Sequence, residues 1–404
     1  MLNILFVDDD PVFLKRMQAE TALSNPGWTT SIASDGIEAL TKLGEETFDV
    51  LISDMKMSGM DGVELLRNTK VRHPDVVRII LTGYEETAMV MKSLGTAHQY
   101  LAKPSDVKTI QSTIRKTCAL RDMLKRDSLR EMVSTLNTVP SLPTLYSELM
   151  DEVNSADPSI KHIGQIVEKD IGMTVKILQI VNSAFFGLQR HVSNATDAVM
   201  YLGIDTITSL TLSLGIFAQF DKKIIDIRMV EEFRAHSESV GAMAKLLAST
   251  EKPETAGDAF TAGLVHDIGE LVLAYNMPEE YSRSRAFAKE QEISLLDAEL
   301  ELFGATHAEI GAYLLSLWGI PWTVVEAVAY HHKPSEYLTP SFSALTAVHM
   351  ADVFHNSRDP RAQTPRLQNC DVPYLAKLGL LEKVPEWHEE FVHFFVDEEE
   401  PVAA

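Results

Sequence analysis

Residues 2–10 read LNILFVDDD, an apolar run of strand length that stops at three successive aspartates. A short apolar run of this kind, bounded by polar residues, is typical of a buried strand. Further strands are expected at Thr29–Ala33, which gives the weakest signal, and at Val50–Ser53, Arg78–Leu81 and Gln99–Ala102. Helical periodicity fills the intervening segments Val12–Ala22, Gly36–Leu43, Gly62–Thr69 and Glu86–Leu94. This alternation predicts an α/β fold with a doubly wound sheet of five parallel strands.

The expected strands end at chemically active side chains. Asp8 and Asp9 follow the first strand, Asp54 the third, Thr82 the fourth and Lys103 the fifth. In a doubly wound sheet, ligands bind beyond the carboxyl ends of the strands, so these residues should converge in one crevice. Three carboxylates close together need a cation, and oxygen ligands suit Mg²⁺. We therefore expect Asp54 to accept a phosphoryl group as a nucleophile, while Lys103 and the Thr82 hydroxyl bind its oxygens.

At these residues the sequence resembles the receiver domain of response regulators, over about residues 1–116. The resemblance rests on four motifs: FVDDD at residues 6–10, SDMKMSGMDG at 53–62, LTG at 81–83 and LAKP at 101–104. It implies a flavodoxin-like (CheY-like) fold and makes Asp54 the phospho-acceptor.

The resemblance also assigns roles to the residues around Asp54. It implies that Mg²⁺ is held by Asp8, Asp9, Asp54 and the backbone carbonyl of Lys56. Thr82 and Tyr100 become the switch pair, and Lys103 becomes the phosphate partner. Ser58 stands where the family usually has proline, and we expect this difference to alter rates without abolishing phosphorylation.

After Pro104 the helical pattern continues without Gly or Pro as far as Leu136. We expect one helix from Ser105 to about Asn137, some 50 Å long at about 1.5 Å per residue, which leaves the receiver and acts as a connector. The alternative is two helices broken near Arg126-Asp127. The expected domain limits are residues 1–118 for the receiver and residues 119–137 for the helical linker.

From Pro140 to about Asn356, helical segments are punctuated by Pro, Gly and Asp, which predicts an all-α domain. We assign residues 138–357 to this domain and residues 358–404 to a C-terminal extension that ends in a solvated acidic tail. The apolar stretch Tyr201–Phe220 contains Asp205 and several Ser and Thr residues. We therefore expect a buried helix there and not a membrane span.

The helical domain contains histidines and aspartates of the kind that bind divalent transition metals. The candidate ligands are His236, His266, Asp267, His307, His331, His332 and Asp352. His236 and Asp352 would complete one site around the adjacent pair His266-Asp267. His307, with His331 or His332, would support a second ion, with Asp267 as the bridge. Two such ions would activate water for phosphoester hydrolysis, whereas His349 and His355 are expected to be structural and His191 a loop residue.

This segment resembles the HD superfamily of metal-dependent phosphohydrolases and, more narrowly, an HDOD domain. The matching motifs are PSLP at residues 140–143, ILQIVNSAFFG at 177–187, YLG at 201–203, GLVHDIG at 263–269, FGATH at 303–307, WGIP at 318–321 and HHKP at 331–334. An HDOD domain implies a regulatory, non-catalytic module. The related HD-GYP phosphodiesterases carry a Gly-Tyr-Pro segment after the paired histidines and a lysine three positions after the aspartate. Here Lys333–Tyr337 and Glu270 occupy those positions, which counts against cleavage of cyclic-di-GMP.

Bulk composition narrows the classes of partner. The chain has 404 residues and a formal net charge of -22, and an acidic surface disfavours direct contact with nucleic acid. Its two cysteines, Cys118 and Cys370, have no metal-ligand spacing and fit a reducing compartment. We find no signal-peptide pattern and expect a cytoplasmic protein without membrane insertion.

These features predict a phosphorelay response regulator. A sensor histidine kinase would phosphorylate Asp54, and the HDOD domain would act on an unknown protein partner or through a homodimer formed by the linker helix. The alternative is a metal-dependent phosphohydrolase of the HD superfamily that is gated by phosphorylation.

Overall fold

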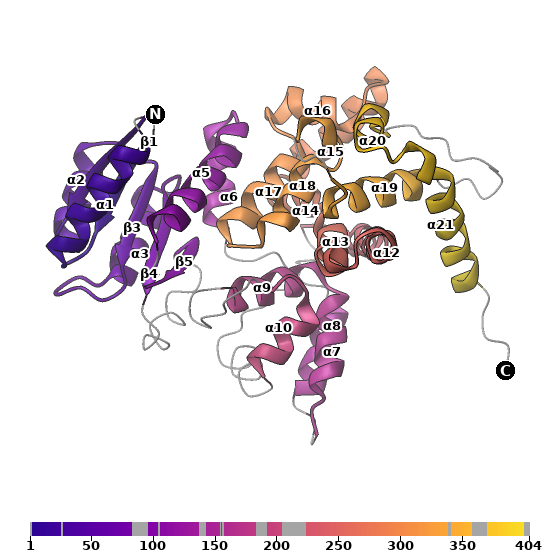
Figure 1. Cartoon of the computed structure of the whole chain (residues 1–404), viewed down its shortest axis with the longest axis horizontal. Coiled ribbons are helices and arrows are strands. Elements are labelled where there is room, and N and C mark those ends of the chain that lie inside the picture. The colour runs from indigo at the N-terminus through magenta and orange to yellow at the C-terminus, as the bar shows by residue number, and fades with distance from the viewer. Residues whose placement is uncertain are drawn as a thin grey trace.

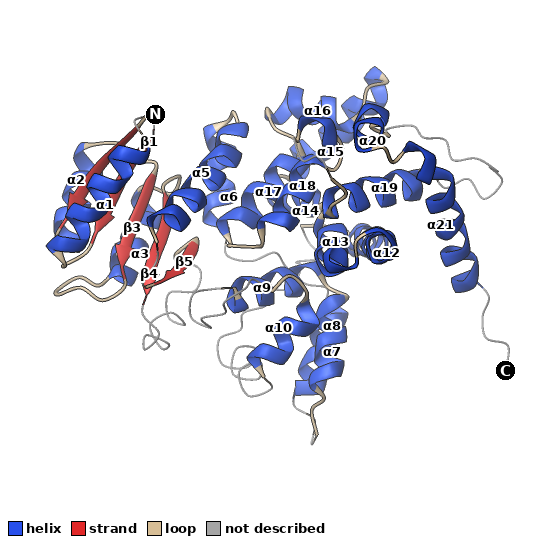
Figure 2. Ribbon diagram, viewed as in Figure 1, coloured by secondary structure: helices blue, strands red, loops and turns tan. Residues whose placement is uncertain are grey.

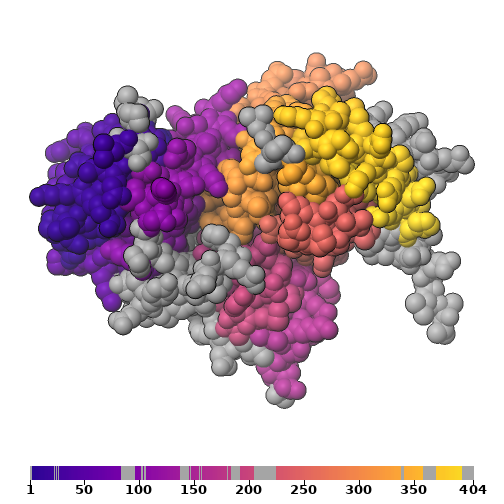
Figure 3. Space-filling model, in the orientation of Figure 1, coloured from indigo at the N-terminus to yellow at the C-terminus, as the bar shows by residue number. Residues whose placement is uncertain are grey.

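The computed structural model describes residues 2–25, 27–82, 96–103, 106–136, 143–153, 155, 157–182, 192–203, 224–337, 341–357 and 370–399. Figure 1 shows an N-terminal α/β part followed by a helical part, and Figure 2 shows that the strands lie in the first part. The two parts are in direct contact, as the space-filling view in Figure 3 shows. Ile114 of the first part and Tyr313 of the second belong to one buried apolar cluster.

The N-terminal part is built on a five-stranded parallel sheet with the order β2-β1-β3-β4-β5. The strands are β1 (Leu2–Val7), β2 (Trp28–Ala33), β3 (Val50–Asp54), β4 (Val77–Thr82) and β5 (Gln99–Ala102). The predicted doubly wound α/β fold is therefore confirmed, including the weakly signalled second strand. The helix expected at Glu86–Leu94 lies outside the described residues.

Helices cover both faces of this sheet. They are α1 (Pro11–Ser24), α2 (Gly36–Glu45), α3 (Gly62–Arg72) and α5 (Val107–Met123). Alternate residues of β1 point to opposite faces, as the period of a strand requires. Ile4 packs in the cluster that contains α1 and α5, whereas Leu5 packs in the cluster that contains α2 and α3.

The linker consists of two helices, so the prediction of one continuous helix was wrong. Helix α5 ends at Met123, and α6 (Asp127–Thr135) begins after a short extended segment. Leu124 in this break is fully buried, and the Arg126 guanidinium donates to the carbonyl of Leu302 at 2.8 Å. The break lets α6 pack back against the helical part instead of projecting from the receiver. Its apolar residues Leu129 and Val133 are buried within the chain.

The second part is all-α in its described residues, as predicted. Its α-helices are α7 (Pro143–Val153), α8 (Ile160–Glu168), α9 (Ile171–Val181), α10 (Ala195–Leu202), α12 (Ile227–Glu251), α13 (Ala256–Val265), α14 (Ile268–Asn276), α15 (Pro278–Gln291), α16 (Leu295–Phe303), α17 (His307–Leu317), α18 (Trp322–Tyr330) and α19 (Ala344–Asn356). Short 3₁₀ turns lie at Pro253–Thr255 and Pro334–Glu336. Most of the stretch Tyr201–Phe220 lies outside the described residues. Within the described residues, no helix has both the length and the apolar character needed to cross a bilayer.

The C-terminal extension is folded over much of its length. Helix α20 (Val372–Leu378) and a 3₁₀ turn (Leu381–Lys383) lead into α21 (Val384–Glu399). Trp387 is only 1% exposed, and its indole nitrogen donates to Glu251 of α12 at 3.1 Å. The start of α21 therefore packs against the helical part, whereas the side chains of the predicted acidic tail lie outside the described residues.

Candidate functional sites

The first site lies at the carboxyl edge of the sheet. The Lys103 ammonium lies 2.8 Å from Asp8 and 2.6 Å from Asp54. Asp8, Asp9 and Asp54 each present a carboxylate oxygen, and these oxygens lie within 4.8 Å of one another. Asp8 and Asp54 are buried, whereas Asp9 is exposed. The structure thus brings together residues that are separated by up to 95 positions in the sequence.

The charges of this site do not balance within the protein. Burial raises the pKa of Asp54 above its ordinary value, and Asp8 adds to the rise, although Lys103 opposes it. The Lys103 ammonium contacts only Asp8 and Asp54, while all three carboxylates bring an oxygen within 4.8 Å of the others. A hard divalent cation would relieve this repulsion, and Mg²⁺ fits an oxygen-only donor set. The residues present therefore fit the implied metal.

The loop after Asp54 is held close to the site by a glycine. The backbone N–H of Gly62 donates to the carbonyl of Met55 at 3.0 Å. A Cβ atom at Gly62 would collide with the backbone carbonyl of Asp54, so this approach requires glycine. Lys56 and Ser58 lie in the same loop with exposed side chains.

The two predicted switch residues are both buried. Thr82 ends β4, and its hydroxyl lies 3.6 Å from the sulfur of Met55. Tyr100 is 7% exposed and lines a cavity of about 270 Å³ between the two parts of the chain. Ser316 of α17 lines the same cavity. Tyr100 therefore lies at the contact between the sheet and the helical part.

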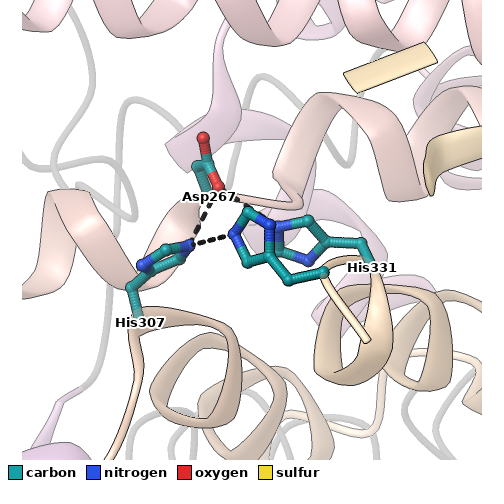
Figure 4. Close-up of side chains that lie close together, drawn as sticks. Asp267, His307 and His331 are labelled. Carbon is teal, nitrogen blue, oxygen red and sulfur yellow. Dashed lines mark hydrogen bonds and ion pairs between the residues drawn. The ribbon is translucent and has the colours of Figure 1, made fainter. Parts of the chain in front are cut away.

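The second site is assembled from six helices of the helical part. His236 lies in α12, His266 directly follows α13, Asp267 directly precedes α14, His307 begins α17, His331 and His332 follow α18, and Asp352 lies in α19. Figure 4 shows Asp267, His307 and His331 pointing toward one another. Three overlapping groups drawn from these seven residues have ligand atoms within 4.8 Å of one another.

Asp267 lies between two halves of this cluster, one containing His236 and His266 and the other containing His307 and His331. Its Oδ2 atom is 3.1 Å from His266 Nε2 and 3.4 Å from His236 Nε2. Its Oδ1 atom is 3.3 Å from His307 Nε2 and 3.5 Å from His331 Nε2. One carboxylate thus faces both halves, which is the arrangement that a bridging ligand between two ions needs.

Hydrogen bonds at the Nδ1 atoms orient the imidazole rings so that their Nε2 atoms face the centre of the cluster. His266 Nδ1 lies 2.7 Å from the Gly263 carbonyl, and His331 Nδ1 lies 2.8 Å from the Val328 carbonyl. A carbonyl only accepts, so each Nδ1 carries the proton and donates, and a neutral ring keeps its Nε2 lone pair for the centre. His307 Nδ1 lies 2.8 Å from the carboxylate of Glu299.

Several atoms at the centre lack a conventional partner. His236 and His266 bring their Nε2 atoms within 3.1 Å of each other, and His307 and His332 within 3.0 Å. Among the described residues, Asp267 Oδ1 and His331 Nε2 make no hydrogen bond despite being buried. Converging lone pairs with mixed nitrogen and oxygen donors fit a divalent transition metal. These residues therefore fit the implied metal as well.

Protons compete with a cation in this cluster. Burial alone would lower the pKa of His266, but Asp267 and Asp352 beside it raise the pKa to about 10. Burial also lowers the pKa values of His236 and His307, but the nearby carboxylates raise them by more. The pKa values of both histidines are therefore raised. His331 has a lowered pKa, because burial disfavours its charged form. Without a metal, imidazolium charges therefore balance the acids.

Four further residues complete the surroundings, and sequence reasoning did not assign them to the site. Glu299 is fully buried and binds His307, while His355 lies 2.9 Å from His236. The Tyr281 hydroxyl donates to Glu270 at 2.5 Å, and Arg285 lies 3.5 Å from the same carboxylate. Helix α16 also contains Asp297 and Glu301, so no signal in the sequence singled out Glu299. His349, expected to be structural, has Nδ1 2.6 Å from the His331 carbonyl.

Solvent reaches the second site through an open pocket. This pocket has a volume of about 620 Å³ and contains His236, Asp267, Glu270 and Arg285 in its wall. The cluster is therefore accessible to an ion and to a small molecule, although most of its ligands are buried.

The fold and the sites define a receiver-type domain joined to an HD-type helical domain. Family models match in the same order: the response regulator receiver domain at residues 4–115 and the HDOD domain at residues 139–334. Sporulation initiation phosphotransferase F of Bacillus subtilis (strain 168) is 35% identical over 125 residues, which are 30% of this chain and 98% of that protein. The chain belongs to the response regulators, with a receiver domain followed by an HDOD domain.

Two further comparisons cover more of the chain. An uncharacterized protein of Treponema pallidum (strain Nichols) is 27% identical over 237 residues, which are 57% of this chain and 45% of the relative. The chain therefore spans less than half the length of that relative. The crystal structure of the MmoQ response regulator from Methylococcus capsulatus str. Bath is similar with a TM-score of 0.48 and 23% identity, covering 60% of this chain and 98% of that one.

Proposed function

We propose that Asp54 accepts the phosphoryl group and that Mg²⁺ at Asp8, Asp9, Asp54 and the Lys56 carbonyl enables the transfer. The ion shields the incoming phosphate from the acids, and Lys103 pairs with a phosphate oxygen. Thr82 binds another oxygen, and Tyr100 responds to its movement. The observation that carries this proposal is the contact of Lys103 with both Asp8 and Asp54 at one sheet edge.

Acetyl phosphate tests this proposal directly. Incubation of the full chain with acetyl phosphate and Mg²⁺ should add one phosphoryl mass, and the adduct should be lost with EDTA in the reaction. Asp54→Asn should prevent the adduct. Asp35→Asn is a matched control, because Asp35 caps α2 away from the acidic cluster. An adduct that persists in Asp54→Asn and maps to another residue refutes the assignment.

The phosphoryl donor and the output follow from the same proposal. A receiver domain implies a donor such as a sensor histidine kinase, and donors of this class place the reaction in the cytoplasm. The HDOD domain would then act through contact with a protein partner, after phosphorylation changes its contact with the receiver.

A second function, metal-dependent phosphoester hydrolysis, is favoured by the cluster around Asp267. Mixed nitrogen and oxygen donors converge there at the wall of an open pocket. A bound transition metal would supply an activated water, while Asp267 would bridge the two halves of the cluster.

Elemental analysis of the native protein separates the two functions. Bound transition metal that disappears in Asp267→Asn, together with phosphate release from a phosphoester panel, would support hydrolysis. His162→Asn serves as the control, since His162 lies on α8 and pairs with Glu152 outside the cluster. If the protein contains no transition metal and shows no turnover, hydrolysis is excluded and only the regulatory function remains.

A further inference from the structure

Helix α17 contacts both the metal-type cluster and the receiver domain. Its first residue, His307, faces Asp267 in the metal-type cluster at 3.3 Å. Its last turn contains Ser316, which contacts the receiver. In Figure 1, α17 lies between the linker helices and α14 with α18, and it packs against all of them. The helix is therefore a direct physical link between the sheet and the cluster.

The receiver binds the far end of α17 through polar contacts from β5 and α5. The side-chain amide of Gln99 donates to the Ser316 carbonyl at 2.5 Å and to the Thr117 hydroxyl at 3.2 Å. The hydroxyls of Thr117 and Ser316 lie 3.1 Å apart. Gln99 immediately precedes Tyr100, and the strand that holds both leads directly to Lys103. A shift of β5 at the phosphorylation site thus acts on α17 through these bonds.

A second contact joins the middle of α17 to β4. The Tyr313 hydroxyl lies 3.1 Å from the hydroxyl of Ser134 in α6. The Ser134 carbonyl in turn accepts a hydrogen bond from the fully buried Arg78 side chain at 3.0 Å. Arg78 lies in β4, which ends at Thr82. Both strands that carry phosphate-binding side chains at their ends are therefore tied to α17.

At the cluster, α17 cannot move independently of the helix that follows Asp267. A Cβ atom at Gly269 of α14 would collide with the backbone carbonyl of His307. Cβ at Gly311 would lie 3.1 Å from the Gly269 nitrogen. The two backbones are in direct contact without intervening side chains, so a displacement of α17 changes how His307 and Asp267 face each other.

We propose that α17 couples the two sites, so that a phosphoryl group on Asp54 and a divalent metal at His307 change each other's affinity. Gln99 and Ser316 are positioning residues in this coupling, because they act on the cluster through α17. The inference depends on the proposed phosphorylation of Asp54. Linkage requires the effect to be reciprocal: each ligand must shift the affinity of the other by the same factor.

The experiment measures this factor in the full chain. Co²⁺ is titrated by its absorbance in excess Mg²⁺, with and without beryllofluoride as the phosphoryl mimic. We expect the Co²⁺ dissociation constant to change by roughly fivefold or more, the usual size of such couplings. Beryllofluoride titrations with and without Co²⁺ should give the same factor. In the double variant Gln99→Leu, Ser316→Ala the factor should fall, because the bonds from β5 to α17 are lost and the contact through Tyr313 remains, while each ligand still binds alone.

Gln18→Leu is the matched control, because the Gln18 amide bonds the Thr30 carbonyl inside the receiver and does not contact α17. It should keep the wild-type factor. Undiminished coupling in the double variant overturns the route through α17. Independent binding of both ligands to the wild-type chain overturns the inference while leaving phosphorylation intact. Failure of beryllofluoride to bind at all overturns the proposed function and the inference with it.

Discussion

Metal binding at the Asp267 cluster should release protons, and the number released can be worked out from the geometry. His236 and His266 both face Asp267, and their pKa values are raised, that of His266 to about 10. His266 is therefore protonated in the metal-free protein near pH 6, and the raised pKa of His236 favours its protonated form. A metal ligand must be a neutral imidazole, so an ion that binds both rings displaces up to two protons.

The carboxylates beside His236 and His266 release no further protons when a metal binds. The pKa values of Asp267 and Asp352 are held well below the ordinary range by the neighbouring histidines, although burial opposes this, so both are already ionised. Each displaced proton contributes about tenfold in affinity per pH unit, so affinity should rise by about tenfold between pH 5.5 and 6.5 from His266 alone, and further from His236. In the other half only His307 has a raised pKa, while those of His331 and His332 are lowered by burial. That half should therefore show about a tenfold change.

Calorimetry in two buffers of different ionisation enthalpy measures the protons directly, and Co²⁺ absorbance gives the affinity at each pH. His236→Asn should reduce the release in its half by up to one proton. His162→Asn should leave it unchanged, because this exposed histidine lies on α8. An affinity that does not depend on pH over this interval would show that the imidazoles are neutral before metal arrives, and the electrostatic account of the cluster would be wrong.

Three further predictions concern stability and are read from urea unfolding. In metal-free buffer, Asp54→Asn should raise the free energy of unfolding by about 1 kcal/mol, because it removes a buried charge beside Asp8; a decrease would contradict the charge imbalance. Gly62→Ala should cost about 2 kcal/mol through its collision with the Asp54 carbonyl, whereas Gly44→Ala, which meets open space, should be neutral or stabilising; equal midpoints would refute this contact. Trp387→Ala should cost about 3–5 kcal/mol, against at most about 0.5 kcal/mol for the half-exposed Val392→Ala; a small loss for Trp387 would mean that α21 contributes little.

The receiver site was predictable from sequence because the topology of the sheet determines where its side chains lie. In a parallel sheet, every strand delivers the residue after its carboxyl end to the same edge, so four strand ends suffice to define the site. The linker was less predictable. Leu124, Leu129 and Val133 are all buried, so the apolar pattern continues across the break. Periodicity reports which residues are buried and not whether the helix axis turns between them.

The cluster in the helical part is positioned by helix packing and not by strand ends, which explains why the sequence did not reveal its outer residues. Its ligands come from six helices, and their distances are set by close backbone contacts such as Gly269 against His307. Sequence motifs identify the ligands but not outer residues such as Glu299, which stabilise a charged or metal-bound imidazole from behind.

The carboxylates that contact the imidazoles bear on how the cluster can serve a regulator. With Glu299 behind His307 and Asp352 beside His266, protonated rings are stabilised when no metal is bound. We therefore expect the helical domain to fold without the ion, unlike a structural zinc site, which needs its metal to fold. A site that is stable in both states can bind and release metal in response to a change elsewhere in the chain, and the contacts of α17 with β5 provide a physical route for that change.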